Sequence, residues 1–143
     1  MPADPPSAAV RFEDIELGDE LPEEHPDVSL DKVRLFVEAA RIVAARFLDD
    51  EEAKKQGLPG AIVPGMMSQG ILAAMIHRWA PGAQIVKLDT VFRSPVLVGS
   101  APHCTGAVTD TDEETRTVEI DLTMTADSGQ TSVIGTALVR LPD

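Results

Sequence analysis

The chain has 143 residues, of which 43% are hydrophobic and 25% charged, as expected for one globular domain with its own core. Its 24 acidic residues outnumber its 12 lysines and arginines, and the net charge of −12 argues against nonspecific nucleic-acid binding. No run approaches the roughly 18 apolar residues of a membrane span, and the N-terminus lacks the features of a secretory signal. We therefore expect a soluble, cytoplasmic protein without membrane contact, in which a bound anion needs a local basic patch.

The N-terminal region divides into two parts. Residues 1–10 contain proline, alanine and serine without periodicity, so we expect a loose arm there and one domain over residues 11–143. The segment FEDIELGDELPE, which begins at Phe12, alternates short apolar and acidic positions. This pattern indicates a strand or a turn centred near Gly18.

A first helix is predicted to begin after Ser29, a natural N-cap, with Asp31 in its first turn. Its buried face is expected to carry Val33, Phe36, Val37 and Ala40, which recur at helical spacing. The following RIVAARFL is predicted to continue this helix. Gly57, Pro59 and Gly60 then turn the chain.

The least polar segment of the sequence runs from Pro64 to about Trp79 and predicts a long, largely buried helix that ends at Pro81. Its apolar positions surround the helix axis and comprise Met67, Ile71, Leu72, Met75 and Ile76. Gly70, Ala73 and Ala74 are small enough for other backbones to approach closely.

The remainder of the sequence is predicted to form strands and turns. A long first strand covers 85–97, and a weaker second one covers 102–108, where proline and glycine suggest an edge or a bulge. TVEIDLTMT at 117–125 alternates strictly, and VIGTALVRL at 133–141 does so with small residues included. The inner positions are Val118, Ile120, Leu122 and Met124 in the third strand, and Val133, Gly135, Ala137, Val139 and Leu141 in the fourth. A buried helix followed by a four-stranded antiparallel meander is an α+β arrangement.

Three stretches in this order resemble the MaoC-like hydratases, and the similarity runs from Phe12 to Pro142. They are FEDIELGDELPE, DDEEAKKQGLPGAIVPGMMSQGI and LDTVFRSPVLVGS. The resemblance implies a hot-dog fold, in which an antiparallel sheet wraps around a long central helix. It also implies a substrate that is a coenzyme A thioester, either a trans-2-enoyl or a 3-hydroxyacyl compound, and no further cofactor.

The family's acid/base signature is absent from this sequence. That signature reads Gly-Asp-x-Asn-Pro-(Ile or Leu)-His-x-Asp, and its Asp and His move the proton. With the stretch anchored on Asp49, Ile42 stands at the Asp position and Phe47 at the His position. A shift of one residue brings in Val43 and Leu48, neither of which can carry a proton. The resemblance therefore gives no confident catalytic residue.

The other half of the family's site depends on backbone N–H groups at the start of the central helix, which polarise the thioester oxygen. Gly65, with Met66 beside it, fits this position, although a Pro-Gly pair can equally be a simple helix start. Pro64 replaces the family's usual histidine there. We expect Ile42, Phe47 and Pro64 to contribute to an acyl pocket.

Other candidate groups have simpler structural explanations. His77 falls in the last turn of the central helix, where a cation is favoured, and His25 lies in an early loop. His103 and the only cysteine, Cys104, are neighbours on a strand and point to opposite faces, so Cys104 is expected to be packed rather than nucleophilic. The aspartates at 49–50 are expected to cap a helix. With three scattered histidines, no metal site is expected.

Three hypotheses on function remain open. The first is a non-catalytic hydratase subunit that shapes the acyl pocket for a partner carrying the Asp and His. The second is a self-sufficient hydratase or thioesterase with an atypical site. The third is a binding or structural module without catalysis. In each case an exposed sheet edge favours a homo- or heterodimer with another hot-dog protein.

Overall fold

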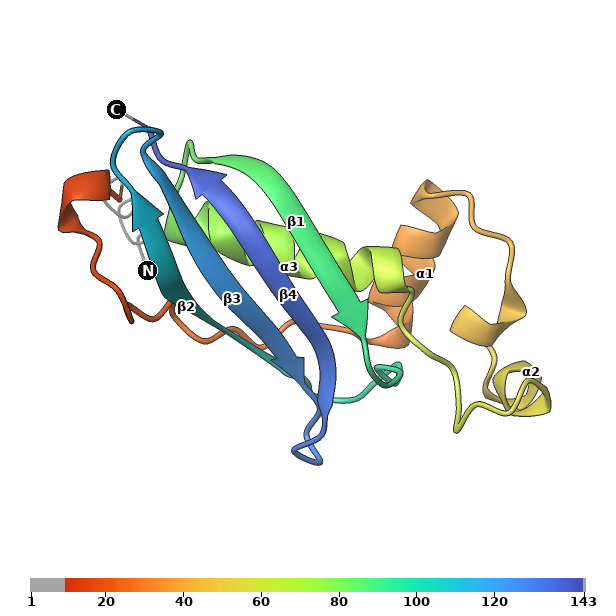
Figure 1. Ribbon diagram of the computed structural model, residues 1–143. Helices are drawn as coiled ribbons and strands as arrows, with labels where there is room; N and C mark the ends of the chain where they lie inside the picture. The colour runs from red at the N-terminus through yellow and green to blue at the C-terminus, as the bar shows by residue number, and fades with distance from the viewer. Residues whose placement is uncertain (1–9, 143) are drawn as a thin grey trace, which may run out of the picture.

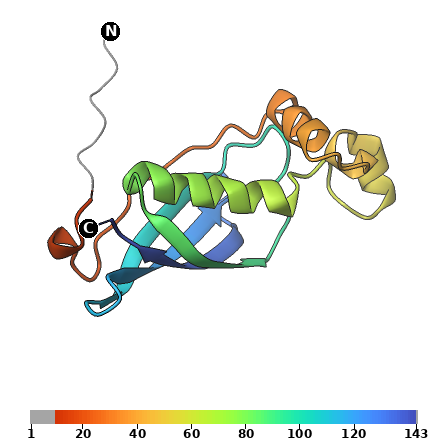
Figure 2. The same ribbon diagram turned by 90° about the horizontal axis from the view of Figure 1, so that it is seen from above.

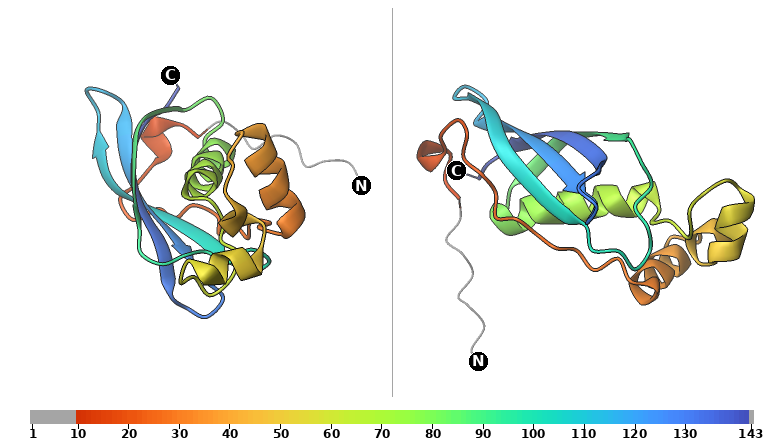
Figure 3. Two further views of the ribbon diagram at one scale, coloured as in Figure 1. Left: turned by 90° about the vertical axis from the view of Figure 1, so that its right-hand side faces the viewer. Right: turned by 90° about the horizontal axis from the view of Figure 1, so that it is seen from below.

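Four antiparallel strands and one long helix form the centre of the computed structural model, which describes residues 10–142 (Figure 1). The helix, α3 at Gly65–Trp79, lies across one face of the sheet, and the sheet curves around it (Figures 2 and 3). This arrangement confirms the expected α+β hot-dog fold. The arm predicted for residues 1–10 falls almost entirely outside the described residues. No helix within residues 10–142 combines the length and apolar character needed to cross a membrane.

The strands are β1 at Gln84–Phe92, β2 at His103–Asp112, β3 at Thr117–Thr125 and β4 at Thr131–Arg140. Their order in the sheet is β1-β4-β3-β2, so only the last three form the predicted meander and β1 pairs with β4 instead. The first strand also ends at Phe92 rather than at residue 97. The two strands with the most regular apolar alternation occupy the centre of the sheet, and the edge strand β1 carries the charged Lys87 and Asp89, as edge strands commonly do.

The core lies between the inner face of the sheet and α3. The register places Val118 opposite Val139 and Leu122 opposite Gly135, so that the alternating positions of β3 and β4 meet on one face. All of them are buried, which confirms the period-two prediction, and Leu72, Met75 and Ile76 of α3 are fully buried with them. Gly70, by contrast, faces open space rather than a neighbouring backbone.

Helix α1 spans Leu30–Ala39 and begins as predicted, because the Ser29 hydroxyl accepts a hydrogen bond from the Lys32 N–H. The predicted continuation through RIVAARFL is wrong. Arg41 adopts a left-handed conformation with φ of 56°, and the N–H of Ile42 donates to the Val37 carbonyl. This is the hydrogen-bond pattern of a Schellman motif, which ends a helix.

The segment around Gly18 covers one edge of the sheet. The Gly18 N–H donates to the Val108 carbonyl and the Leu21 N–H to the Gly106 carbonyl, with a positive φ of 87° at Gly18. The edge of β2 is therefore shielded. At the opposite side of the sheet, no other segment within residues 10–142 pairs with the free edge of β1.

Candidate functional site

A cavity of about 410 Å³ opens at the N-terminal end of α3, on the side where α1 and α2 lie in Figures 1 and 2. The short 3₁₀ helix η2 at Ala45–Phe47 and helix α2 at Asp50–Lys55 precede this end of α3 in the chain. The cavity is lined by Arg46, Phe47, Ile62, Val63, Gly65, Ser68, residues 92–96 and Val133.

The wall segment, residues 61–63, contributes Ile62 and Val63 to the cavity lining and is held by hydrogen bonds on two sides. The Ile62 N–H donates to the Arg46 carbonyl at 3.1 Å, and the Val63 N–H donates to the Val96 carbonyl at 2.8 Å. Segments distant in sequence are thereby fixed against each other, and the side chains of η2 are placed opposite the end of β1.

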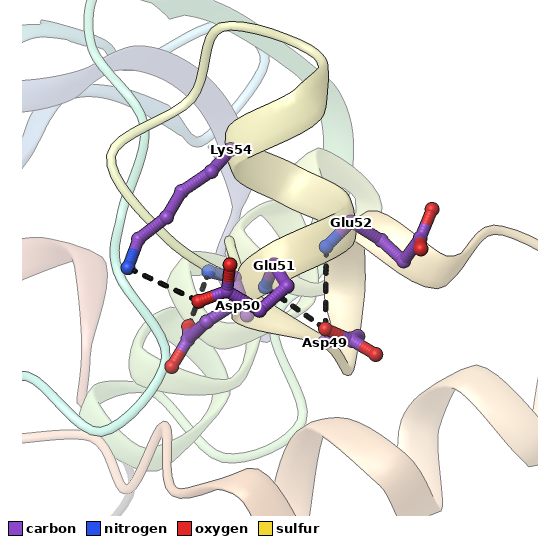
Figure 4. A network of polar contacts seen from close by, with 6 residues as sticks. Asp49, Asp50, Glu51, Glu52 and Lys54 are labelled. Carbon is purple, nitrogen blue, oxygen red and sulfur yellow. Dashed lines mark hydrogen bonds and ion pairs between the residues drawn. The ribbon is translucent and has the colours of Figure 1, made fainter.

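The two adjacent aspartates have different roles, and only Asp50 anchors this wall (Figure 4). Asp49 caps α2 as predicted, since its Oδ1 accepts hydrogen bonds from the N–H groups of Glu51 at 2.9 Å and Glu52 at 3.2 Å. Asp50 has a second role that the sequence did not reveal. Its Oδ1 accepts a hydrogen bond of 2.7 Å from the N–H of the buried Ala61, at the start of the wall segment.

Gly65 is the first residue of α3, where backbone N–H groups lack partners within the helix and carry partial positive charge. A Cβ atom at this position would lie 3.0 Å from Cζ of Phe92, so glycine allows the Phe92 ring to pack against the start of the helix. The Phe92 side chain is 52% exposed. The ring therefore covers the helix N-terminus without sealing it.

The structure brings together two of the predicted site residues. Phe47, which is buried, and Gly65 both line the cavity. Ile42, Pro64 and Met66 are not among the residues that line it. Ile42 follows the Schellman turn and packs partly against the core, which gives its apolar character a structural reason, and Met66 is 64% exposed. A role for these three in substrate binding stays a prediction.

The cavity contains polar groups but no carboxylate or imidazole among its described lining residues. The polar side chains are Arg46, Arg93, Ser68 and Ser94. Arginine remains protonated in proteins and serine hydroxyls do not titrate near neutral pH, so none of these groups is suited to exchange a proton with a substrate. The cavity can orient and polarise a bound molecule, but it lacks a general acid or base.

The remaining candidates lie outside this cavity. His77 is exposed on the last turn of α3. His25 and His103 approach each other with ring centroids 6.2 Å apart, and each has Nε2 at 3.8 Å from a carboxylate oxygen of Glu23. Cys104 is fully buried, and this burial raises the pKa of its thiol from 9.0 to about 12. Within residues 10–142, no group of three or more His, Cys, Asp or Glu side chains is arranged to hold a metal ion.

The raised pKa of Cys104 predicts a stability change at alkaline pH. Because the thiol ionises more readily in the unfolded chain than in the folded one, the free energy of unfolding should fall as the pH rises from about 9 towards 12. Urea unfolding at pH 8 and pH 10.5 measures this effect. Cys104→Ala is the control, since the part of this fall in unfolding free energy that depends on the thiol should be absent from it. An equal fall in both proteins would contradict the attribution of the effect to Cys104.

The comparison with protein families finds a match to the MaoC like domain over residues 48–130. This range contains α2, α3, β1, β2 and β3 and thus most of the cavity wall. No curated protein matches the sequence.

Comparison with solved structures finds closely similar folds. An (R)-hydratase from A. caviae involved in PHA biosynthesis has a TM-score of 0.85 at 20% identity, over 91% of this chain and 99% of its own. A MaoC-like dehydratase has a TM-score of 0.87 at 27% identity over 94% of this chain, which spans only 43% of that protein. The ChsH1-ChsH2 complex from Mycobacterium tuberculosis has a TM-score of 0.82 at 18% identity, over 89% of this chain and 98% of the matched chain.

Proposed function

The chain belongs to the MaoC-like domain family of dehydratases and hydratases, and we propose that it is the acyl-pocket-forming, non-catalytic subunit of a heteromeric enoyl-CoA hydratase or 3-hydroxyacyl-CoA dehydratase. One observation carries the proposal: the cavity keeps a helix N-terminus at Gly65, while its described lining residues include no proton-transfer group. The substrate is a coenzyme A thioester, the reaction needs no further cofactor, and the complex acts in the cytoplasm.

In this proposal the thioester oxygen accepts a hydrogen bond from the backbone N–H groups of Gly65 and Met66. Hydration at the double bond places negative charge on that oxygen, and a helix N-terminus stabilises such charge. Phe47 and the wall of Ile62 and Val63 contact the acyl group. The partner subunit supplies the Asp and His that position the water and move the proton.

The proposed partner is a second hot-dog protein that pairs with the free edge of β1. Unpaired backbone groups along that edge favour the addition of another strand. The apolar side chains of β1 support this placement, since Val86 is 45%, Val91 58% and Phe92 52% exposed. A fold similar to this chain occurs in the ChsH1-ChsH2 complex, which has two named components.

Reconstitution tests this function. The purified chain is assayed for hydration of crotonyl-CoA and longer enoyl-CoA thioesters, alone and after co-expression with a MaoC-like protein that carries an intact Asp and His. Since a positioned general acid or base contributes about 10²–10⁴-fold, we expect the lone chain to be slower than the complex by at least about 100-fold. The partner alone is the matched control. Full activity of the lone chain would contradict the proposal.

A further inference from the structure

The candidate cavity differs in its acidic side chains from three other hollows on the surface of residues 10–142. These three hollows each contain at least two acidic side chains: Asp110, Asp112 and Glu119 in one, Glu13 and Glu113 in the second, and Glu20, Glu23 and Asp121 in the third. The cavity at Gly65 contains none and has two arginines instead, Arg46 and Arg93. In a chain of net charge −12, this local positive charge matches the basic patch that an anionic ligand requires.

The two arginines approach the cavity from different elements and have free donors. Arg46 extends from η2, and Arg93 directly follows β1. Within residues 10–142, neither side chain has a carboxylate partner or a hydrogen bond, whereas Arg78 and Arg116 are paired with Glu24 and Glu13. Cζ of Arg46 lies 4.7 Å from the ring centroid of Phe47. A guanidinium stacked on a ring keeps its in-plane N–H groups available for an anion.

The Ser68 hydroxyl is a further polar group in the same cavity, independent of the two arginines. Its side chain lines the cavity one turn after Gly65, and the residue is only 1% exposed. Among residues 10–142, no hydrogen-bond partner faces its hydroxyl. The Ser68 hydroxyl is unpaired but not sealed from the cavity, so a polar group of a ligand can form a hydrogen bond with it there.

We propose that the cavity selects acyl thioesters whose acyl group carries a carboxylate, that is, monothioesters of short dicarboxylic acids. The inference rests on the proposed function and specifies its substrate class. The thioester oxygen lies at the N-terminus of α3, and the distal carboxylate binds between Arg46 and Arg93, with Ser68 as a further donor. A plain alkyl chain at this position would leave two guanidinium groups partly desolvated without a counter-ion, which disfavours it.

Calorimetric titration of the full chain with phosphate-free thioesters tests the inference. Succinyl-pantetheine and butyryl-pantetheine differ by a carboxylate in place of a methyl group, and neither contains the phosphates of coenzyme A. We expect succinyl-pantetheine to bind roughly tenfold more tightly, as one charge-assisted contact would give. Arg46→Met and Arg93→Met should each reduce this preference. Arg34→Met, which removes an exposed arginine outside the cavity, should keep it, and Arg93→Lys should retain part of it.

Titration with butyryl-CoA separates failure of the inference from failure of the proposed function. If the two arginines bind the coenzyme phosphates instead, both pantetheine thioesters bind alike and butyryl-CoA loses affinity in the arginine variants. That result overturns the carboxylate inference and leaves the acyl-pocket function intact. If no thioester binds the chain, both proposals are overturned. Circular dichroism of each variant verifies that the fold is retained.

Discussion

Replacing Leu72 with alanine is expected to lower the free energy of unfolding by about 2–5 kcal/mol. Leu72 is fully buried in the middle of α3, against the inner face of the sheet. The substitution removes apolar contacts and leaves a cavity that a rigid sheet on one side and a helix on the other can fill only partly. Urea unfolding followed by far-ultraviolet circular dichroism measures the change.

His77→Ala is the matched control for this substitution. It truncates another side chain of the same helix, but His77 is exposed, so the expected change is below about 1 kcal/mol. Equal effects of the two substitutions would contradict the position of α3 as the helix around which the sheet wraps.

The strands show what local pattern can predict and what it cannot. The alternation predicts that Val118, Ile120 and Leu122 share one face, because successive side chains in a strand point to opposite sides, and all three are buried. The order of the strands is not a local property. The pairing of β1 with β4 joins Gln84 to Arg140, and alternation within a strand does not specify which distant strand lies beside it.

The sequence does not predict the end of α1, because the residue that usually marks a helix end is absent. Left-handed residues that end helices are most often glycine, and here the position is occupied by Arg41 with φ of 56°. The apolar Ile42 and Val43 that follow favour a longer helix on the sequence pattern alone. Ile42 instead packs partly against the core, whereas Val43 is fully exposed.

The sequence predicts those residues of the candidate site that a single stretch of the chain identifies, but not those that only tertiary contacts bring to the cavity. The resemblance of their own stretches to the family predicts Gly65 and Phe47 as site residues, and both line the cavity. The sequence does not predict Phe92, Arg93 and Ser68 as lining residues, because their shared position depends on contacts between separate elements. The Phe92 ring reaches Gly65 across the space between β1 and α3, and no spacing in the sequence encodes that contact.

Asp50→Ala is expected to lower the free energy of unfolding by about 1–3 kcal/mol and to weaken thioester binding. The substitution removes the acceptor of the 2.7 Å hydrogen bond from the Ala61 N–H, and Ala61 is only 5% exposed, so water cannot easily replace the lost partner. The same segment donates from Ile62 to the Arg46 carbonyl, and its loosening should displace one wall of the cavity. Urea unfolding gives the stability change, and calorimetric titration with butyryl-CoA gives the binding change.

Two further variants separate the Ala61 contact from general damage to α2. Asp50→Asn keeps a carbonyl oxygen at the acceptor position and should retain most of the stability. Asp49→Ala removes the N-cap of α2, at a cost of about 0.5–2 kcal/mol, but leaves the acceptor of the Ala61 N–H in place. Hydrogen exchange at the Ala61 amide discriminates between them: protection should be lost in Asp50→Ala and kept in Asp49→Ala. Because the wall segment carries this amide, unchanged protection in Asp50→Ala would show that the cavity wall is held by its contacts with Arg46 and Val96 alone.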